Sequence, residues 1–218
     1  MKKILYNKFD KKQLNQLPIV SFEGRIIVVI SPGETRKAVD FLLSQPILGV
    51  DTETRPSFQK GISHQVALLQ VSTKDICFLF RLNYTGITPD ILRLLEDKTV
   101  PKIGLSWHDD ISALHHRCEF VPGYFIDIQD HVCELGIEDL SLQKLYTNLF
   151  RQKINKKQQL SNWEAEVLSD KQKLYAATDA WACLKIYEEL MTLKTTNNYQ
   201  LEIVNDELQE NISQKREG

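Results

Sequence analysis

Short apolar runs separated by polar turns fill the first half of the chain and predict β-strands. A β-branched run, Arg25–Ile30, stops at the turn-forming residues that follow it, and Ile47–Glu53 passes from apolar residues into two acids. The runs Val66–Val71 and Ile76–Phe80 are separated by only four polar residues, so we expect them to form an antiparallel hairpin. Lys102–Leu105 is predicted to be a further short strand.

Apolar residues at helical spacing alternate with these strands. Glu34–Ser44 has this spacing, Ile91–Leu95 follows a proline suited to a first helical turn, and Leu140–Leu149 is also predicted to be helical. Further helices are expected to begin near Ser106 and, from a capping-box pattern, at Ser169, the last one running to about residue 190. Strands that alternate with helices are typical of a mixed β-sheet flanked by α-helices, so we predict an α/β fold.

The alternating pattern occupies residues 25–193, which we interpret as one domain. Residues 1–24 are polar and contain several lysines, and we expect this extension to dock on the domain through a few apolar anchors. The chain becomes polar again over residues 194–218. For this tail we expect at most a loose helix around residues 201–208, and disorder at its end.

Composition and charge narrow the classes of function. With 218 residues, 42% of them hydrophobic and 26% charged, the chain matches an ordinary soluble globular protein. Its net charge of −2 gives no overall basic signature, so any affinity for nucleic acid must come from a local patch or from metals. Four scattered cysteines favour reduced thiols, and no apolar run approaches membrane-spanning length. We therefore expect a cytoplasmic protein without membrane contact.

Two acids, Asp51 and Glu53, stand at the end of one predicted strand. Alternate residues of a strand share a face, so the two carboxylates should point the same way. Like charges that are buried together are costly, and a divalent cation removes that cost. Mg²⁺ and Mn²⁺ prefer such hard oxygen ligands. The alternative is a strand end with two solvated acids.

Two predicted helices carry further candidates. In the helix that begins near Ser106, Asp110 lies at the shoulder of the apolar stripe and can reach the edge of the sheet, whereas Asp109 should face water. A favourable contact with the helix dipole is the alternative role for such an acid. In the last helix, Tyr175 and Asp179 are four residues apart and share a face, and neighbouring alanines would let this helix approach the sheet closely.

Cationic side chains are the candidates for contacts with nucleic acid. Arg55 and Lys60 belong to the loop that leaves the acidic strand end, where a phosphate ligand would sit. A later cationic stretch, which includes Lys153 and Lys156, is the best candidate for following a nucleic-acid backbone. A solvated charged surface is the alternative interpretation of both groups.

In this order and context the candidate residues resemble the motifs of the DEDD superfamily of 3′–5′ exonucleases, in the subgroup whose last motif is Tyr-x-x-x-Asp. The motifs stand here as Leu-Gly-Val-Asp-Thr-Glu-Thr, Lys-Ile-Gly-Leu-Ser-Trp-His-Asp-Asp and Tyr-Ala-Ala-Thr-Asp-Ala. The chain is similar to ribonuclease D and to the exonuclease domain of the Werner syndrome helicase over most of its length. In the second motif, the family spacing from Gly104 selects Asp110.

The resemblance implies a ribonuclease H-like fold, two divalent ions (Mg²⁺ or Mn²⁺) and a DNA or RNA 3′ end as partner. By analogy with the family, Asp51 bridges both ions, and Glu53 and Asp179 complete the first ion site. Asp110 supports the second site, and Tyr175 orients the attacking water. Together these residues would release nucleoside 5′-monophosphates from single-stranded nucleic acid.

The same resemblance implies that the enzyme recognises a terminal 3′-hydroxyl, near Glu53 and the backbone of Thr52 and Thr54.

Two other functions remain open on this fold. One is a non-catalytic module that binds nucleic acid, and the other is a subunit whose polar ends dock on a protein partner.

Overall fold

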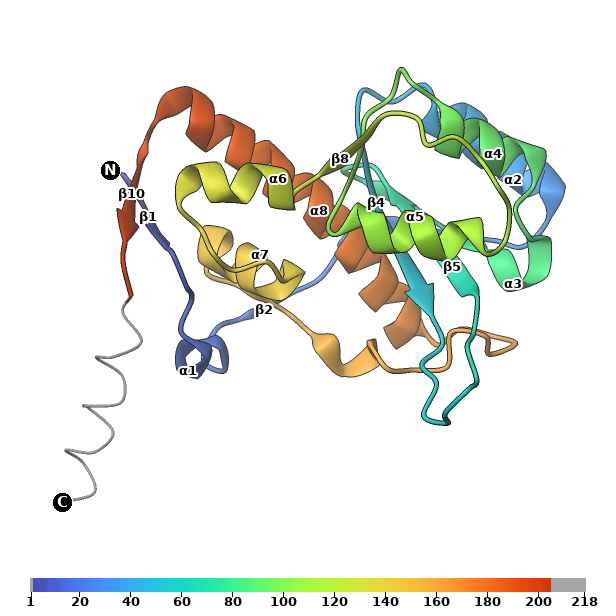
Figure 1. The fold of residues 1–218 in the computed structure, drawn as a ribbon, viewed down its shortest axis with the longest axis horizontal. Coiled ribbons are helices and arrows are strands. Elements are labelled where there is room, and N and C mark those ends of the chain that lie inside the picture. Colours follow the sequence, from blue (N-terminus) through green and yellow to red (C-terminus); the bar gives the residue numbers. More distant parts are fainter. Residues whose placement is uncertain (1, 205–218) are drawn as a thin grey trace.

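A six-stranded mixed sheet forms the centre of the molecule in the computed structural model, which describes residues 2–204 (Figure 1). The strand order is β3-β6-β5-β4-β7-β8, and β5 runs antiparallel to both of its neighbours. The strands are β3 (Arg25–Val29), β4 (Leu48–Thr54), β5 (Val66–Ser72), β6 (Ile76–Arg81), β7 (Lys102–Gly104) and β8 (Phe125–Asp127). The predicted hairpin between β5 and β6 is therefore confirmed, as is the predicted mixed sheet.

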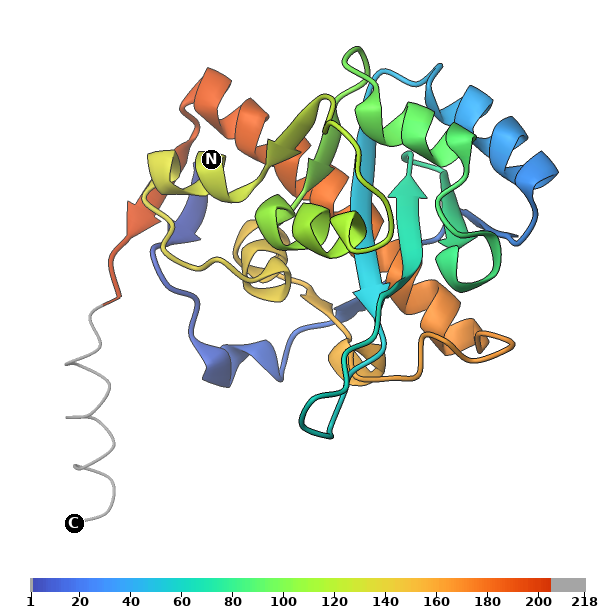
Figure 2. The same cartoon turned by 45° about the vertical axis from the view of Figure 1, so that its right-hand side comes forward.

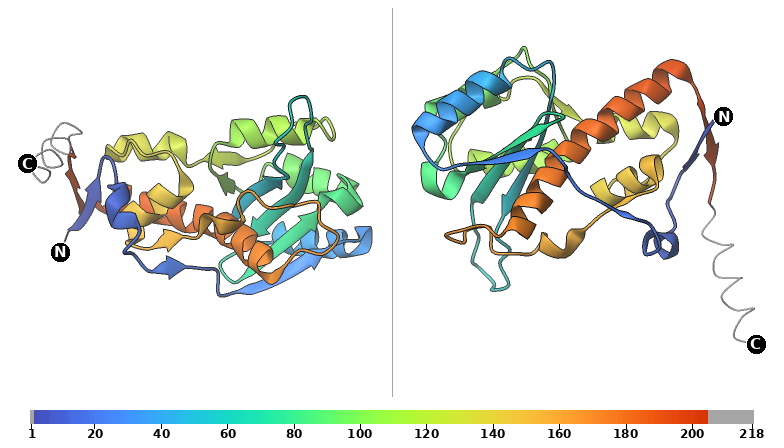
Figure 3. Two further views of the ribbon diagram at one scale, coloured as in Figure 1. Left: turned by 90° about the horizontal axis from the view of Figure 1, so that it is seen from below. Right: turned by 180° about the vertical axis from the view of Figure 1, so that it is seen from behind.

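Helices cover both faces of this sheet. Three helices pack on the face of the sheet that carries Val50: α2 (Pro32–Leu42), α4 (Pro89–Glu96) and α5 (Trp107–His115). The long helix α8 (Asp170–Thr196) crosses the other face, as Figure 2 and the rear view in Figure 3 show. The shorter helices are α1 (Lys11–Leu14), α3 (Leu82–Thr85), α6 (Gln129–Val132) and α7 (Leu142–Phe150), with 3₁₀ turns η1 (Cys133–Leu135) and η2 (Lys156–Gln158).

Helix α8 begins at the predicted capping box but ends later than predicted. The Ser169 hydroxyl accepts a bond from the backbone of Gln172, whose own side chain accepts one from the Ser169 backbone. The helix continues to Thr196, because Leu193 is still buried in the core and only Asn197 adopts the left-handed conformation (φ 49°) that ends it. The predicted end near residue 190 was therefore wrong.

The two ends of the described chain lie side by side (Figure 3). Strand β1 (Lys3–Tyr6) pairs in parallel with β10 (Tyr199–Glu202), and β2 (Ile19–Val20) pairs with β9 (Lys153–Ile154). The expectation of a loose helix is wrong for residues 201 and 202, because they belong to β10, whose backbone is satisfied by pairing with the distant β1. The remainder of that expected helix, which included Leu208, lies partly outside the described residues.

Close contact between α8 and β4 depends on a glycine. A Cβ atom at Gly49 would lie 2.1 Å from the carbonyl oxygen of Ala180 in α8, a distance that real Cβ atoms do not reach. The alanines of α8 therefore meet a strand that has no side chain at this point, which is the close approach that the sequence predicted. Within residues 2–204, no helix is long and apolar enough to cross a membrane.

Candidate active site

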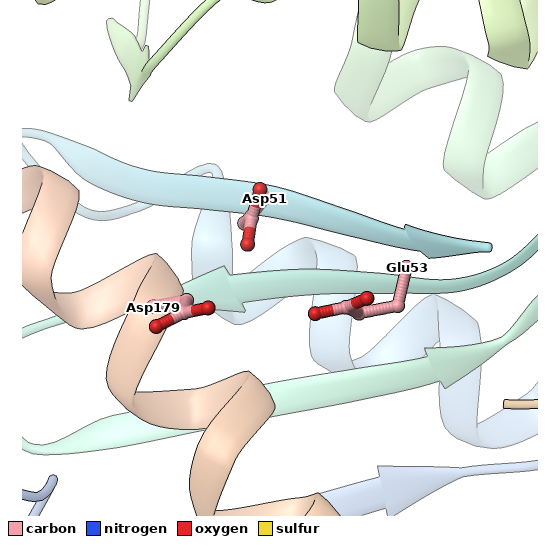
Figure 4. Close-up of side chains that lie close together, drawn as sticks. All are labelled: Asp51, Glu53 and Asp179. Atoms are coloured by element: carbon pink, nitrogen blue, oxygen red, sulfur yellow. The ribbon is translucent and has the colours of Figure 1, made fainter. Parts of the chain in front are cut away.

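Three carboxylates from two elements converge above the sheet (Figure 4). Asp51 and Glu53 project from β4, and Asp179 projects from α8. One oxygen of each carboxylate lies within 4.8 Å of an oxygen of the other two. Glu53 and Asp179 are buried, with 8% and 6% of their surface exposed, and Asp51 is partly exposed.

Strand periodicity and the Gly49 contact together produce this convergence. Gly49, Asp51 and Glu53 are alternate residues of β4, so they share the face that α8 covers. Because the backbone of α8 approaches Gly49 at Ala180, the preceding residue, Asp179, lies close to the two strand acids. The opposite face of β4 carries Val50 and Thr52 towards the layer that contains α5.

Burial and mutual repulsion raise the pKa values of these acids. Burial, followed by the charges of Asp110 and Asp179, raises the pKa of Asp51 well above its usual range. Burial, and then the charge of Asp51, raises the pKa of Glu53 to about 10. The pKa of Asp179 rises to about 7 because burial outweighs the favourable effects of the Tyr175 hydroxyl and the Lys156 charge.

The cluster also contains polar atoms that the protein does not satisfy. Within the described part of the chain, Asp179 Oδ1 is buried and has no hydrogen-bond partner. Gln70, which lies opposite Asp51 in the β4–β5 register, is fully buried and has no partner for either of its amide atoms. Clustered carboxylates with an unpaired buried oxygen fit a divalent cation, which supplies the missing positive charge.

Asp110 lies beside the cluster but outside the group of three. Its carboxylate accepts a hydrogen bond from the Thr52 hydroxyl, on the α5 side of β4. Burial raises the pKa of Asp110 to about 6, and its charge in turn raises the pKa values of Asp51 and Glu53. The neighbouring Asp109 is exposed, as the helical pattern predicted.

Another acid holds the start of α5, and therefore Asp110, in place. The Asp127 carboxylate accepts bonds from the backbone nitrogens of Ser106 (3.1 Å) and Trp107 (2.8 Å). Ser106 has the left-handed conformation (φ 61°), which turns the chain from β7 into the helix. Trp107 is buried against Phe125, with ring centroids 4.7 Å apart, so it is a core residue.

Tyr175 lies one turn before Asp179 on α8. It is largely buried, and its ring packs near Trp163, with centroids 5.9 Å apart. Burial and the neighbouring acids Asp179 and Glu53 raise the pKa of its hydroxyl, which therefore stays protonated at neutral pH. A protonated hydroxyl beside the acids can donate a hydrogen bond.

A cleft of about 350 Å³ opens over these residues. Its walls include Ser106, Gln143, Lys156 and Gln159, together with the three clustered acids and Tyr175. No sequence pattern marked Ser106, Gln143, Gln159 or the nearby Gln70 as a functional residue. For Gln70 a signal existed, because it is the one polar side chain in the run Val66–Val71.

The cationic residues predicted to contact nucleic acid do not gather in one place. Lys156 lies in its wall, and Lys153 lies further out, where its ammonium donates to the Asn15 carbonyl (2.8 Å). Arg55 is paired with Glu164 (3.2 Å). Lys60 is exposed in the loop beyond β4, and Thr54 is half-buried at the end of that strand.

Comparison with known proteins places the sequence in a family. Residues 27–193 match the family model described as 3′–5′ exonuclease. The chain is 29% identical over 192 residues to the mouse bifunctional 3′–5′ exonuclease/ATP-dependent helicase WRN, covering 84% of this chain and 14% of that protein. It is 28% identical over 218 residues to a 3′–5′ exonuclease of Arabidopsis thaliana, covering 86% of this chain and 72% of that protein.

Solved structures share the fold. The Nibbler EXO domain of Aedes aegypti superposes with a TM-score of 0.73 at 21% identity, covering 82% of this chain and 92% of that chain. Escherichia coli RNase D superposes with a TM-score of 0.70 at 18% identity, covering 80% of this chain and 46% of that chain. These likenesses confirm the predicted ribonuclease H-like α/β fold. Because the family model spans most of the sequence, the chain belongs to the 3′–5′ exonuclease family.

Proposed function

We propose that this protein hydrolyses the 3′-terminal phosphodiester of single-stranded nucleic acid, releases nucleoside 5′-monophosphates, and depends on two divalent ions, Mg²⁺ or Mn²⁺. Membership of the exonuclease family supports the reaction class. The observation that carries the proposal is the convergence of Asp51, Glu53 and Asp179 within 4.8 Å, with one buried oxygen of Asp179 unpaired.

The acids supply the ligand set that such ions require. Asp51 is central, since its pKa responds to the charges of both Asp110 and Asp179, and it would contact both ions. Glu53 and Asp179 would complete one site, and Asp110, held by Thr52, would support the other. When bound, the ions would lower the pKa of the attacking water and stabilise the charge that develops on the scissile phosphate.

The remaining side chains orient and admit the substrate. The protonated Tyr175 hydroxyl would position the nucleophilic water by a hydrogen bond. Glu53 and the backbone of Thr52 and Thr54 would meet the terminal 3′-hydroxyl at the end of β4. Cationic contacts to phosphates would come from Lys156 in the cleft wall, from Lys153, and from Arg55 and Lys60 on the loop beyond β4.

An end-labelled oligonucleotide tests the reaction and its direction. With Mg²⁺ or Mn²⁺, a 5′-labelled single strand should shorten in a ladder, and a 3′-labelled strand should release its label as mononucleotide in the first step. EDTA should stop both. The non-catalytic alternative is supported, and the proposal fails, if wild-type protein with either metal leaves both strands intact.

Site variants then connect the reaction to the acids. Asp51→Asn should abolish trimming, whereas Asp109→Asn removes an exposed acid from the turn that carries Asp110 and should leave it unchanged. Equal turnover by Asp51→Asn and wild type would contradict the assignment. Matched DNA and RNA strands in the same assay determine which nucleic acid is preferred.

A further inference from the structure

A groove lined by four lysines lies next to the catalytic cleft. We call it the lysine groove; it has a volume of about 530 Å³, and its lysines are Lys11, Lys144, Lys153 and Lys156. Among the described residues, no acidic side chain lines it. In a chain with a net charge of −2, four cations on one concave surface mark a site for an anionic partner.

The groove is continuous with the cleft. Ser141, Gln143 and Lys156 line both hollows, so a ligand that leaves the cleft past these residues enters the groove directly. The charge of Lys156 also acts on the acid cluster, because it opposes the rise in the pKa of Asp179 that burial causes. A chain with regularly spaced anionic groups could therefore occupy both hollows at once.

The N-terminal segment forms one wall of the groove and is fixed to the domain. The Phe9 backbone nitrogen donates to the buried Asp139 carboxylate (2.6 Å), which also pairs with Lys144 of the opposite wall. The Lys153 backbone donates to the Pro18 carbonyl (2.9 Å), and its ammonium donates to the Asn15 carbonyl. Residues 11–15 are thus held across from α7 and β9.

Most of the groove's charge is available to a ligand. In the part of the chain that the structure describes, neither Lys11 nor Lys156 forms an ion pair, and Lys153 bonds only a neutral carbonyl. Lys144 is neutralised by Asp139. The nearby Arg151 has a structural role, since its guanidinium donates to the carbonyls of Ile4 and Asn148 and stacks on aromatic rings.

We propose that the lysine groove holds the phosphates of the substrate strand on the 5′ side of the scissile linkage, so that residues 11–15 form part of the substrate path. This inference rests on the proposed function. A second hollow of about 390 Å³ offers the competing route on the other side of Tyr175. Its lining contains two lysines, Lys157 and Lys171, where the lysine groove contains four. Apolar side chains such as Ile19 and Leu174 form much of the remainder, so this hollow suits a run of phosphates less well than the groove does.

Binding of a labelled single-stranded oligonucleotide, measured by fluorescence anisotropy in EDTA, tests the groove without requiring hydrolysis. The double variant Lys11→Glu/Lys156→Glu should bind about five- to thirtyfold more weakly than wild type. The slope of log affinity against log salt should fall by about 0.7 for each phosphate that the variant no longer neutralises. The milder Lys11→Gln/Lys156→Gln pair should change both quantities in the same direction and keeps the test valid if charge reversal unfolds the protein.

A charge-matched control distinguishes the groove from general attraction. Lys171→Glu/Lys98→Glu alters two exposed lysines, one of which lines the competing hollow, and should bind as wild type does. Equal weakening by both double variants, or wild-type affinity and salt slope in both groove variants, would overturn the inference. If wild type trims oligonucleotides while the groove variants bind normally, the inference fails and the proposed function stands.

Photocrosslinking locates the strand. Oligonucleotides that carry a photoreactive base at successive positions from the 3′ end are irradiated with the protein in EDTA, and crosslinked peptides are identified by mass spectrometry. Upstream positions should crosslink to residues 11–15 or to Gln143. Upstream crosslinks that fall instead on Ile19 or Leu174 would place the strand in the competing hollow and contradict the inference.

Discussion

At the scale of single residues, the site concentrates negative charge that the metal-free protein must tolerate. Asp51, Glu53 and Asp179 are close together, and their raised pKa values record the free-energy cost of ionising them in place. Strand and helix periodicity and the motifs predicted that Asp51, Glu53 and Asp179 would lie together, and the structure brings these three carboxylates into one cluster. Tyr175 lines the same cleft. The hydrogen bond from the Thr52 hydroxyl to Asp110 could not be predicted, because only the tertiary fold brings these two residues together.

Stability of the metal-free protein should fall as the pH rises. The folded-state pKa values of Asp110 (about 6) and Asp179 (about 7) lie above the ordinary values of unfolded acids, so the folded state binds more protons. The stabilisation from these bound protons is complete below about pH 4, where unfolded acids are also protonated, and it is lost as the pH rises from about 4 through 7. The melting temperature in EDTA should therefore decrease over that window, as differential scanning fluorimetry can measure.

Divalent cations should reverse this loss. Mg²⁺ or Mn²⁺ compensates the ionised carboxylates, so the rise in melting temperature on adding metal should be larger at about pH 8 than at about pH 5. In Asp179→Asn, which lacks one buried charge, the metal-induced rise should be much smaller. A metal effect that is independent of pH in wild type would contradict the coupling of the acids to a cation.

Tyr175→Phe tests whether the Tyr175 hydroxyl positions the attacking water. This substitution removes one hydroxyl and keeps the ring against Trp163, so the fold should be unaffected. Turnover should decrease but stay measurable, because the ions would supply most of the electrostatic stabilisation of the transition state. Loss as complete as in Asp51→Asn, with an unchanged melting temperature, would show that the hydroxyl is indispensable.

At the scale of elements, the approach of α8 to β4 determines where Asp179 lies. The alanines in α8 pointed to close packing, and their partner proved to be Gly49, whose role depends on the register between a strand and a helix about 130 residues later in the chain. Sequence periodicity predicts which face an element buries. It does not identify which residue it meets on another element.

Gly49→Ala should therefore damage stability and activity together. The added methyl would collide with the backbone of Ala180, which cannot move without displacing Asp179 from Asp51. We expect a loss of about 1–3 kcal/mol of unfolding free energy, typical of overpacking, and a marked fall in trimming. Gly33→Ala is the matched control, since a Cβ there meets nothing within 4 Å and both properties should be retained. Urea denaturation and the oligonucleotide assay measure the two effects.

At the scale of the whole molecule, residues 2–24 and 194–204 are joined to the domain and to each other. The central sheet and its flanking helices could be predicted because their signals are local alternation and spacing. The β1–β10 and β2–β9 pairings could not, because each joins short segments that are more than 100 residues apart and carry no strong strand pattern.

Asp139→Ala should loosen the N-terminal segment. The substitution leaves the Phe9 backbone nitrogen and the Lys144 ammonium without their shared partner, at a cost of about 1–3 kcal/mol of unfolding free energy. Hydrogen exchange should rise in residues 3–9 more than in β4 or β5. Unchanged exchange in that segment would show that the strand pairings alone hold it in place.

The central claim is that carboxylates from β4 and α8 form one metal centre. Crystals soaked with Mn²⁺ and a nucleoside 5′-monophosphate test it most directly, by anomalous difference density. We expect two peaks beside Asp51, one of them also contacting Glu53 and Asp179, with the phosphate of the nucleotide next to both. An ordered cluster without anomalous density, or manganese bound only elsewhere, would contradict the account.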